Sequence, residues 1–303
     1  MPKTENKVRQ AENRVVIEGL LSEINLETKV INGKDAIVGE LQIQTGENAV
    51  HTVNAFSYKL KNDGTENNVF KGLTTVMNEY KSVAKVGREE ADRVRITAGQ
   101  ISLNEFYNQQ DQLISKTRIS TNFVNRLTPT DELAPKAEFT LEAVIKEIVD
   151  EIDKKTESET GRKIIKVFVP LYEGKIIPLN LVVADEEAIA YMEANYVANS
   201  TVKVYGDVIN QVTKTTKTEA VAFGKPKEII SSTVISELLV TGGSEVYDEE
   251  NPDAYSVDAI KAGLTERELF LSELKNKKES NSSESSKGGF DTKAKKSDKK
   301  LPF

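Results

Sequence analysis

One order of predicted strands and helices occurs twice along this chain, and this repetition restricts the fold more than any other feature. In the first half, alternating apolar and polar residues predict strands at 14–21, 36–44, 50–58, 93–103 and 113–127. Between the third and fourth strands, residues 69–86 change to the three- and four-residue apolar spacing of a helix. Three strands, a helix and two strands is the order of an OB-fold, a five-stranded barrel.

The second half follows the same order, with strands at 139–152, 164–169, 176–183, 201–211 and 229–240 and a helix at 185–196. Phe139 falls at the place of Val15, and Gly206 at the place of Gly99. The prediction is a mostly β chain with short helices, built as two tandem OB-like barrels. Its predicted parts are a disordered N-terminus 1–12, a first barrel 13–128, a linker 129–136, a second barrel with a C-terminal helix 137–275, and a disordered tail 276–303.

Composition favours a binding protein over an enzyme. The 303 residues include no Cys, no Trp and one His, which leaves little material for common metal sites or nucleophilic triads. His51 has no ligand-type residues spaced around it, so we expect a structural or groove residue and no metal. We find no cofactor motif and no paired acids of a carboxylate-dependent nuclease, and we therefore predict no enzymatic activity and no cofactor.

Two further observations bear on location. No apolar run approaches the roughly 20 residues that span a bilayer. Residues 1–13 are polar and lack the apolar region of a secretion signal. The expectation is a cytoplasmic protein without membrane partners.

Charge is distributed unevenly. The net charge of −7 divides into +1 for residues 1–130, −12 for 131–275 and +4 for 276–303. A polyanion is therefore expected to contact the first barrel and the tail, because the acidic middle would repel it.

Several short motifs, taken together, resemble bacterial and phage single-stranded DNA-binding proteins, called SSB. These are Asn13-Arg14-Val15-Val16 with Gly19 and Leu21, the turn at Gly33, Gly99 with the amide-rich hairpin Phe106 to Gln112, and the terminal Leu301-Pro302-Phe303. The resemblance implies sequence-independent coating of single-stranded DNA in replication or recombination, and recruitment of partner proteins by the C-terminal tip. The chain departs from that family in its two barrels, its lack of Trp and its lysine-rich tail, which suggests a diverged, phage-type member.

A groove for single strands needs cations for phosphates and flat aromatic rings for bases. The candidate binding residues are Phe56, Tyr58, Lys59, Lys61, Arg93, Arg95, Phe106, Tyr107, Lys116 and Arg118, and the candidate partner-binding tip is Leu301, Pro302 and Phe303. Tyr58, Phe106 and Tyr107 are the first choices for stacking. For Phe56 and Phe123 a core position is the favoured interpretation, whereas Lys116 and Arg118 fit a binding groove and an ordinary solvated strand equally well.

Two functions remain open at this stage. The first is the coating of single-stranded DNA by a protein that can also form homo-oligomers. The alternative is a scaffold of a replication complex whose barrels hold proteins rather than DNA. Salt dependence separates them, because affinity for a polyanion falls steeply with salt.

Overall fold

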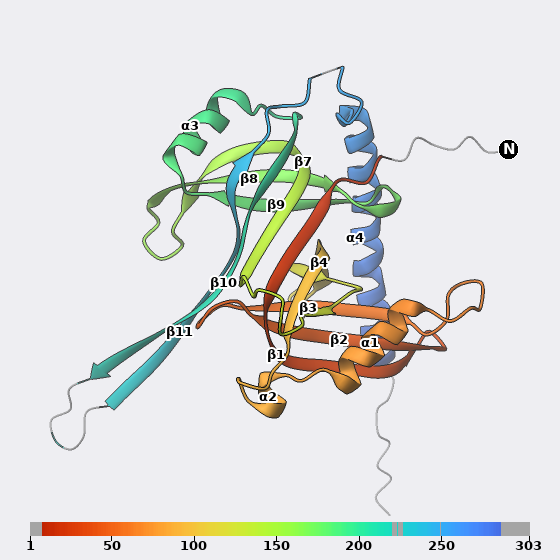
Figure 1. The fold of residues 1–303 in the computed structure, drawn as a ribbon. Helices are drawn as coiled ribbons and strands as arrows, with labels where there is room; N and C mark the ends of the chain where they lie inside the picture. Colours follow the sequence, from red (N-terminus) through yellow and green to blue (C-terminus); the bar gives the residue numbers. More distant parts are fainter. Residues whose placement is uncertain (1–7, 220–222, 224–226, 249, 286–303) are drawn as a thin grey trace, which may run out of the picture.

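The computed structural model describes residues 8–219, 223, 227–248 and 250–285 of the chain. Two five-stranded barrels lie one above the other in Figure 1. The predicted fold class is confirmed: the chain is mostly β with two OB-like barrels.

The first barrel consists of β1 (Asn13–Ile31), β2 (Lys34–Gln44), β3 (Val50–Tyr58), β4 (Arg93–Tyr107) and β5 (Leu113–Ser120). Hydrogen bonding runs in the order β1-β2-β3-β5-β4, and a β1–β4 pairing closes the barrel. The β3–β5 pair is parallel and short, comprising only Val53↔Ile119 and Asn54↔Ser120. Only the C-terminal end of β5 therefore pairs with β3, at the middle of that strand.

The predicted helix at 69–86 is two helices, which corrects that expectation. Helix α1 (Asn68–Glu79) begins at Asn67, whose side chain accepts a hydrogen bond from the Val69 amide, and α2 (Val83–Val86) follows after a break. The break coincides with buried Tyr80, whose hydroxyl donates to the Val124 carbonyl at 3.0 Å.

The second barrel repeats this topology with β7 (Lys136–Ile152), β8 (Glu159–Pro170), β9 (Ile176–Val183), β10 (Thr201–Glu219) and β11 (Lys227–Gly243). The order β7-β8-β9-β11-β10 is closed by β7–β10 pairing, and α3 (Glu186–Asn195) occupies the place of α1. A one-turn helix, η1 (Tyr172–Gly174), joins β8 to β9. Beyond the barrel, β10 and β11 continue as a paired ribbon that projects from the molecule (Figure 1).

The predicted internal repeat is confirmed in its pairing register. Val15 pairs with Gly99 in the first barrel, and Phe139 pairs with Gly206 in the second. The glycine matters because a Cβ atom at Gly206 would lie 1.9 Å from the Leu239 carbonyl oxygen. Each barrel therefore closes with a glycine opposite the inward-facing residue that opens it.

Strand pairing joins the two barrels directly. Antiparallel pairing of β1 with β7, from Asn13↔Leu141 to Glu18↔Lys136, makes one 11-stranded sheet that also includes β6 (Asn125–Arg126). One cluster of buried apolar side chains runs through both barrels. The barrels are thus packed as a single body.

The chain ends differ from the prediction. Residues 8–12, expected to be disordered, cross the second barrel: Arg9 forms an ion pair with buried Glu142 at 2.8 Å, and the Ala11 amide donates to the Pro170 carbonyl. Residues 276–285, expected to belong to a disordered tail, are helical, because α4 (Val257–Ser285) continues through this polar segment. The tip residues Leu301, Pro302 and Phe303 lie outside the described residues.

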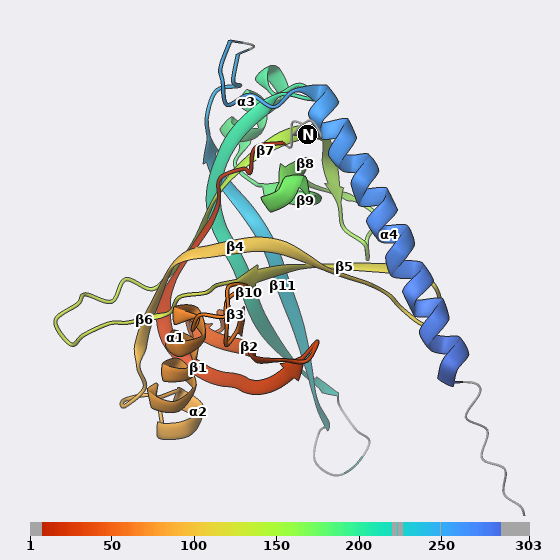
Figure 2. The ribbon, with the colours of Figure 1, turned by 90° about the vertical axis from the view of Figure 1, so that its right-hand side faces the viewer.

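Helix α4 spans both barrels (Figure 2). Ile260 and Leu264 pack into the core cluster, and farther along the helix Arg267 donates to Glu105 of β4. Lys278 contacts the Asp111 carboxylate and the Asn108 carbonyl of the β4–β5 hairpin. The extra length of α4 is therefore held by polar contacts, which apolar periodicity does not reveal. None of the helices in the described part of the chain is long and apolar enough to cross a membrane.

Candidate nucleic-acid interface

The outer surface of the first barrel carries a line of aromatic, amide and basic side chains, which we call the outer track. It consists of Thr52, Asn54, Phe56 and Tyr58 of β3, Lys116 and Arg118 of β5, and Asn104 and Phe106 of β4. The register places these residues on one face, because Asn54 pairs with Ser120, Lys116 with Asn104, and Ile114 with Phe106. Val53 and Ala55, which alternate with them on β3, point into the core. At roughly 3.3 Å per residue, the track is about 30 Å long.

Aromatic rings occupy both ends of the outer track. Phe56 is 38% exposed and Phe106 41% exposed, so Phe56 is a surface residue and not the core residue that the sequence favoured. Tyr58 meets Phe56 edge to face with ring centroids 4.9 Å apart, and Lys34 Nζ lies 5.7 Å from the Tyr58 ring centroid.

Two other aromatic residues lie off the track. Tyr107 is half-buried and shares the opposite face of β4 with Glu105, the face that α4 contacts. Phe123 was expected in a core-facing strand, but β5 ends at Ser120 and Phe123 is 57% exposed. The prediction of one continuous strand up to residue 127 was wrong, because β5 ends at Ser120 and only Asn125–Arg126 return to the sheet, as β6 paired with β4.

The basic candidates divide into paired and unpaired groups. Lys116 and Arg118 form no ion pair within the described chain, and the same holds for Lys61, which lies beyond the end of β3. Lys59, by contrast, forms an ion pair with Asp35 at 3.2 Å. Lys116 and Arg118 are therefore the cations of the track that are available to a phosphate.

Arg93 and Arg95 hold the interbarrel connection instead. Arg95 Nε lies 2.5 Å from the buried Glu18 carboxylate, and Glu18 also accepts a hydrogen bond from the Ala134 amide. The Arg95 hydrogen bond is the main cause of the lowered pKa of Glu18. Arg93 donates to the carbonyls of Thr128 and Asp131. The sequence predicted that both arginines flank the groove. In the structure Arg95 instead pairs with Glu18, and Arg93 binds the carbonyls of residues 128 and 131 in the connection between the barrels.

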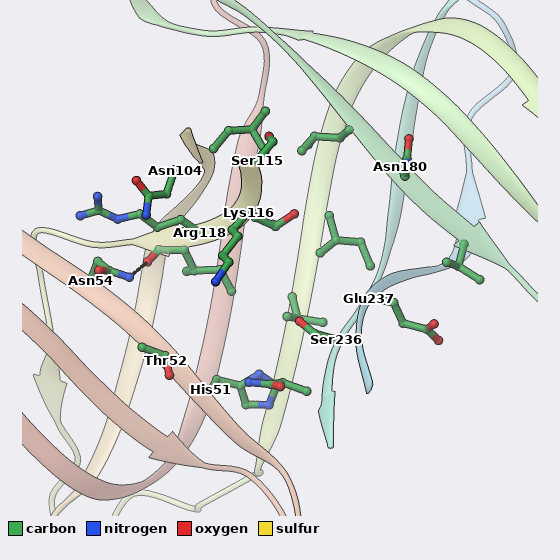
Figure 3. A pocket seen from close by; sticks show the side chains of 18 of the residues that line it. His51, Thr52, Asn54, Asn104, Ser115, Lys116, Arg118, Asn180, Ser236 and Glu237 are labelled. Atoms are coloured by element: carbon green, nitrogen blue, oxygen red, sulfur yellow. Dashed lines mark hydrogen bonds between the residues drawn. The ribbon is translucent and has the colours of Figure 1, made fainter. Parts of the chain in front are cut away.

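A cleft of about 740 Å³ opens between the barrels where β3 and β5 diverge (Figure 3). Thr52, Asn54, Lys116 and Arg118 belong to both the outer track and this cleft, and Asn180 of β9 and Ser236 of β11 lie on its other wall. In Figure 3 the Lys116 side chain runs in the direction of Thr52 and His51. The contribution of the second barrel was missed from sequence, because nothing local to residues 180 or 236 indicates that they face β5.

His51 is both a buried residue and part of the cleft lining. Its Nε2 lies 3.0 Å from Thr45 Oγ1, and burial lowers its pKa to about 4, so the ring is neutral at pH 7. Two buried side-chain polar atoms of the described residues have no hydrogen-bond partner, and both belong to cleft residues: His51 Nδ1 and Arg118 Nε. Among the described residues, no cluster of three or more His, Asp or Glu side chains is placed to hold a metal ion.

Comparisons with known proteins agree with this architecture. A family model described as YorF matches residues 11–277. Among solved structures, a deletion mutant of the single-stranded DNA binding protein from Thermus aquaticus is similar over 80% of this chain and 98% of that chain, with 10% identity and a TM-score of 0.50. A chain of a replication protein A heterotrimer bound to ssDNA matches 75% of this chain and 49% of its own length, with 10% identity and a TM-score of 0.20, too low to carry an argument. No curated protein matches the chain.

Proposed function

This chain belongs to the YorF family, and from its fold and its outer track we propose that it binds and coats single-stranded DNA in replication or recombination without a strict sequence requirement. The proposal is a binding function with no catalysed reaction. The fold that it shares with the Thermus single-stranded DNA binding protein supports this class of ligand.

One observation carries the proposal: exposed aromatic rings and cations without ion pairs lie on one continuous face. Lys116 and Arg118 lie between Phe56 and Tyr58 at one end of the track and Phe106 at the other. Stacking of a base on an aromatic ring contributes about 1–3 kcal/mol and tolerates any base, and lysine or arginine supplies the phosphate contacts. In a duplex the bases are already paired and stacked on one another, so they cannot stack on the rings of the outer track.

The test is fluorescence anisotropy of a labelled oligo-dT strand with unlabelled duplex as competitor. We expect tight binding that duplex does not compete away, and Phe106→Ala to weaken it by about 1–3 kcal/mol. Lys116→Ala is expected to lower the salt slope of log K by about 0.7, the value for one phosphate contact on a single strand. Tyr172→Ala is the matched control, because Tyr172 is 70% exposed on the second barrel, away from the track.

Tyr107→Ala tests whether strand binding depends on the face of β4 that carries the outer track or on any aromatic residue of the β4–β5 hairpin. Tyr107 lies on the opposite face from Phe106, so we expect a smaller loss of affinity than for Phe106→Ala. Absence of strand binding at low salt, or equal binding of duplex, would contradict the proposal and favour the protein scaffold.

We also propose that Leu301, Pro302 and Phe303 recruit replication or recombination proteins. This part rests on the sequence, since these residues lie outside the described ones. Removal of the three residues is expected to abolish co-purification of replication or recombination proteins with this chain and to leave its affinity for oligo-dT unchanged.

A further inference from the structure

The cleft between the barrels has two chemically different walls. On the first-barrel wall, Lys116 and Arg118 carry charges without ion-pair partners in the described chain. On the second-barrel wall, Asn180 and Ser236 offer uncharged donors and acceptors, and the Asn180 side chain makes no hydrogen bond within the described chain. Figure 3 shows Lys116 between the strands of the first barrel and the side chains of Asn180 and Glu237.

The acidic residues of the second-barrel wall are already engaged. Arg162 donates to Glu151 at 2.6 and 2.7 Å and to Glu237 at 2.9 and 3.1 Å. The Arg162 guanidinium thus pairs with both carboxylates and occupies their oxygens with hydrogen bonds. This wall cannot hold phosphates, but its uncharged amide and hydroxyl groups suit the polar edge of a base.

Two polar side-chain atoms of the cleft residues are buried and have no partner among the described residues. Buried polar groups in proteins nearly always have a partner, yet His51 Nδ1 and Arg118 Nε have none within the described chain. The volume of about 740 Å³ is within the range of pockets that enclose a small organic ligand. Lys116 and Asn180 of the cleft lining are exposed, so their polar groups are the ones that an occupant can contact.

We propose that this cleft holds unstacked bases of the bound strand, with the phosphate on Lys116 and Arg118 and the base edge against Asn180 and Ser236. This inference rests on the proposed single-strand binding and extends it. It assigns the second barrel a role in base contact despite its net charge of −12 over residues 131–275. Binding then includes a modest preference among bases, in addition to the sequence-tolerant stacking on the outer track.

The experiment compares an oligo-dT strand with a strand of equal length that has abasic sites at its central positions. Asn180→Ala is expected to weaken oligo-dT binding by about three- to tenfold, the usual effect of losing one hydrogen-bonded contact. Affinity for the abasic strand stays unchanged in this variant, because the backbone contacts remain. Lys116→Ala weakens binding of both strands.

Asn195→Ala is the matched control, since Asn195 is an exposed asparagine of the second barrel at the end of α3. The double variant Asn180→Ala with Ser236→Ala should enlarge the effect. Oligo-dT, oligo-dC and oligo-dA binding that is unaffected by the double variant would overturn the inference and leave the proposed function standing. Absence of strand binding by the wild-type chain would instead overturn the proposed function.

Discussion

The single histidine of this chain, His51, permits a test of whether water is excluded from this part of the cleft lining. His51 is 2% exposed, and burial lowers its pKa from 6.5 to about 4. The folded protein therefore keeps the ring neutral at a pH where the unfolded chain has already taken up a proton. Between pH 6.5 and 4 the unfolded state binds more protons, so the free energy of unfolding decreases as the pH falls.

The size of this effect follows from the two pKa values. Going from pH 7 to pH 5 protonates His51 in most unfolded chains and in few folded ones, which costs about 2 kcal/mol of stability. Carboxylates with lowered pKa, such as Glu18, lose their contribution at more acidic pH, below their usual value of 4.5. The loss above pH 5 thus belongs mainly to the histidine.

The assay is urea unfolding at pH 7 and pH 5 for the wild-type chain and for His51→Gln, which keeps a polar side chain beside Thr45 but cannot titrate. We expect the variant to lose about 2 kcal/mol less stability than the wild type over this interval. NMR titration of the one imidazole should place its midpoint near pH 4 in the folded state. An equal loss in both proteins, or a midpoint near 6.5, would refute the argument that His51 is desolvated.

Three further variants test contacts that hold the barrels. Gly206→Ala places a Cβ atom 1.9 Å from the Leu239 carbonyl oxygen and should cost about 3 kcal/mol; a thermal melt unchanged from wild type would contradict this. Glu18→Gln removes the charge that pairs with Arg95 and should cost about 2 kcal/mol in the same assay, whereas an unchanged melt would mean the ion pair contributes nothing. Arg267→Ala removes the contact of α4 with Glu105 of β4 and leaves the Lys278 contacts with the β4–β5 hairpin, so amide hydrogen exchange near residue 105 should accelerate while β7 stays protected, and unchanged exchange would argue against a restraining role for this contact.

Local patterns in the sequence were sufficient for the repeat and its strand order. Alternation and helical spacing each report a single element, and the two glycines matched by position, Gly99 and Gly206, occupy equivalent pairings in the two barrels. Errors occurred where long-range polar contacts decide the structure. Arg9 is ordered by Glu142, 133 residues away, and Lys278 by a hairpin 167 residues away.

The candidate site was predicted in part for a similar reason. Strand alternation is enough to place Lys116 and Arg118 on one face, and the structure puts them on the outer track beside Phe106. Alternation cannot say which cations are already paired. Arg93 and Arg95 match the same pattern but contact the connection between the barrels, because Glu18 and the carbonyls of residues 128 and 131 lie next to them.

The distribution of charge also limits what a regional count can say about binding. The value of −12 over residues 131–275 suggests a barrel that repels DNA, yet two of its acids in the cleft are bound by Arg162 and leave Asn180 and Ser236 as the accessible groups nearby. Fixed pairing of β1 with β7 brings this wall opposite Lys116 and Arg118. Because screening confines surface charge effects to roughly 10 Å, these neighbours matter more to a bound strand than acids elsewhere on the barrel. A barrel that is acidic as a whole can therefore still contribute base contacts to a site whose phosphates are held by the other.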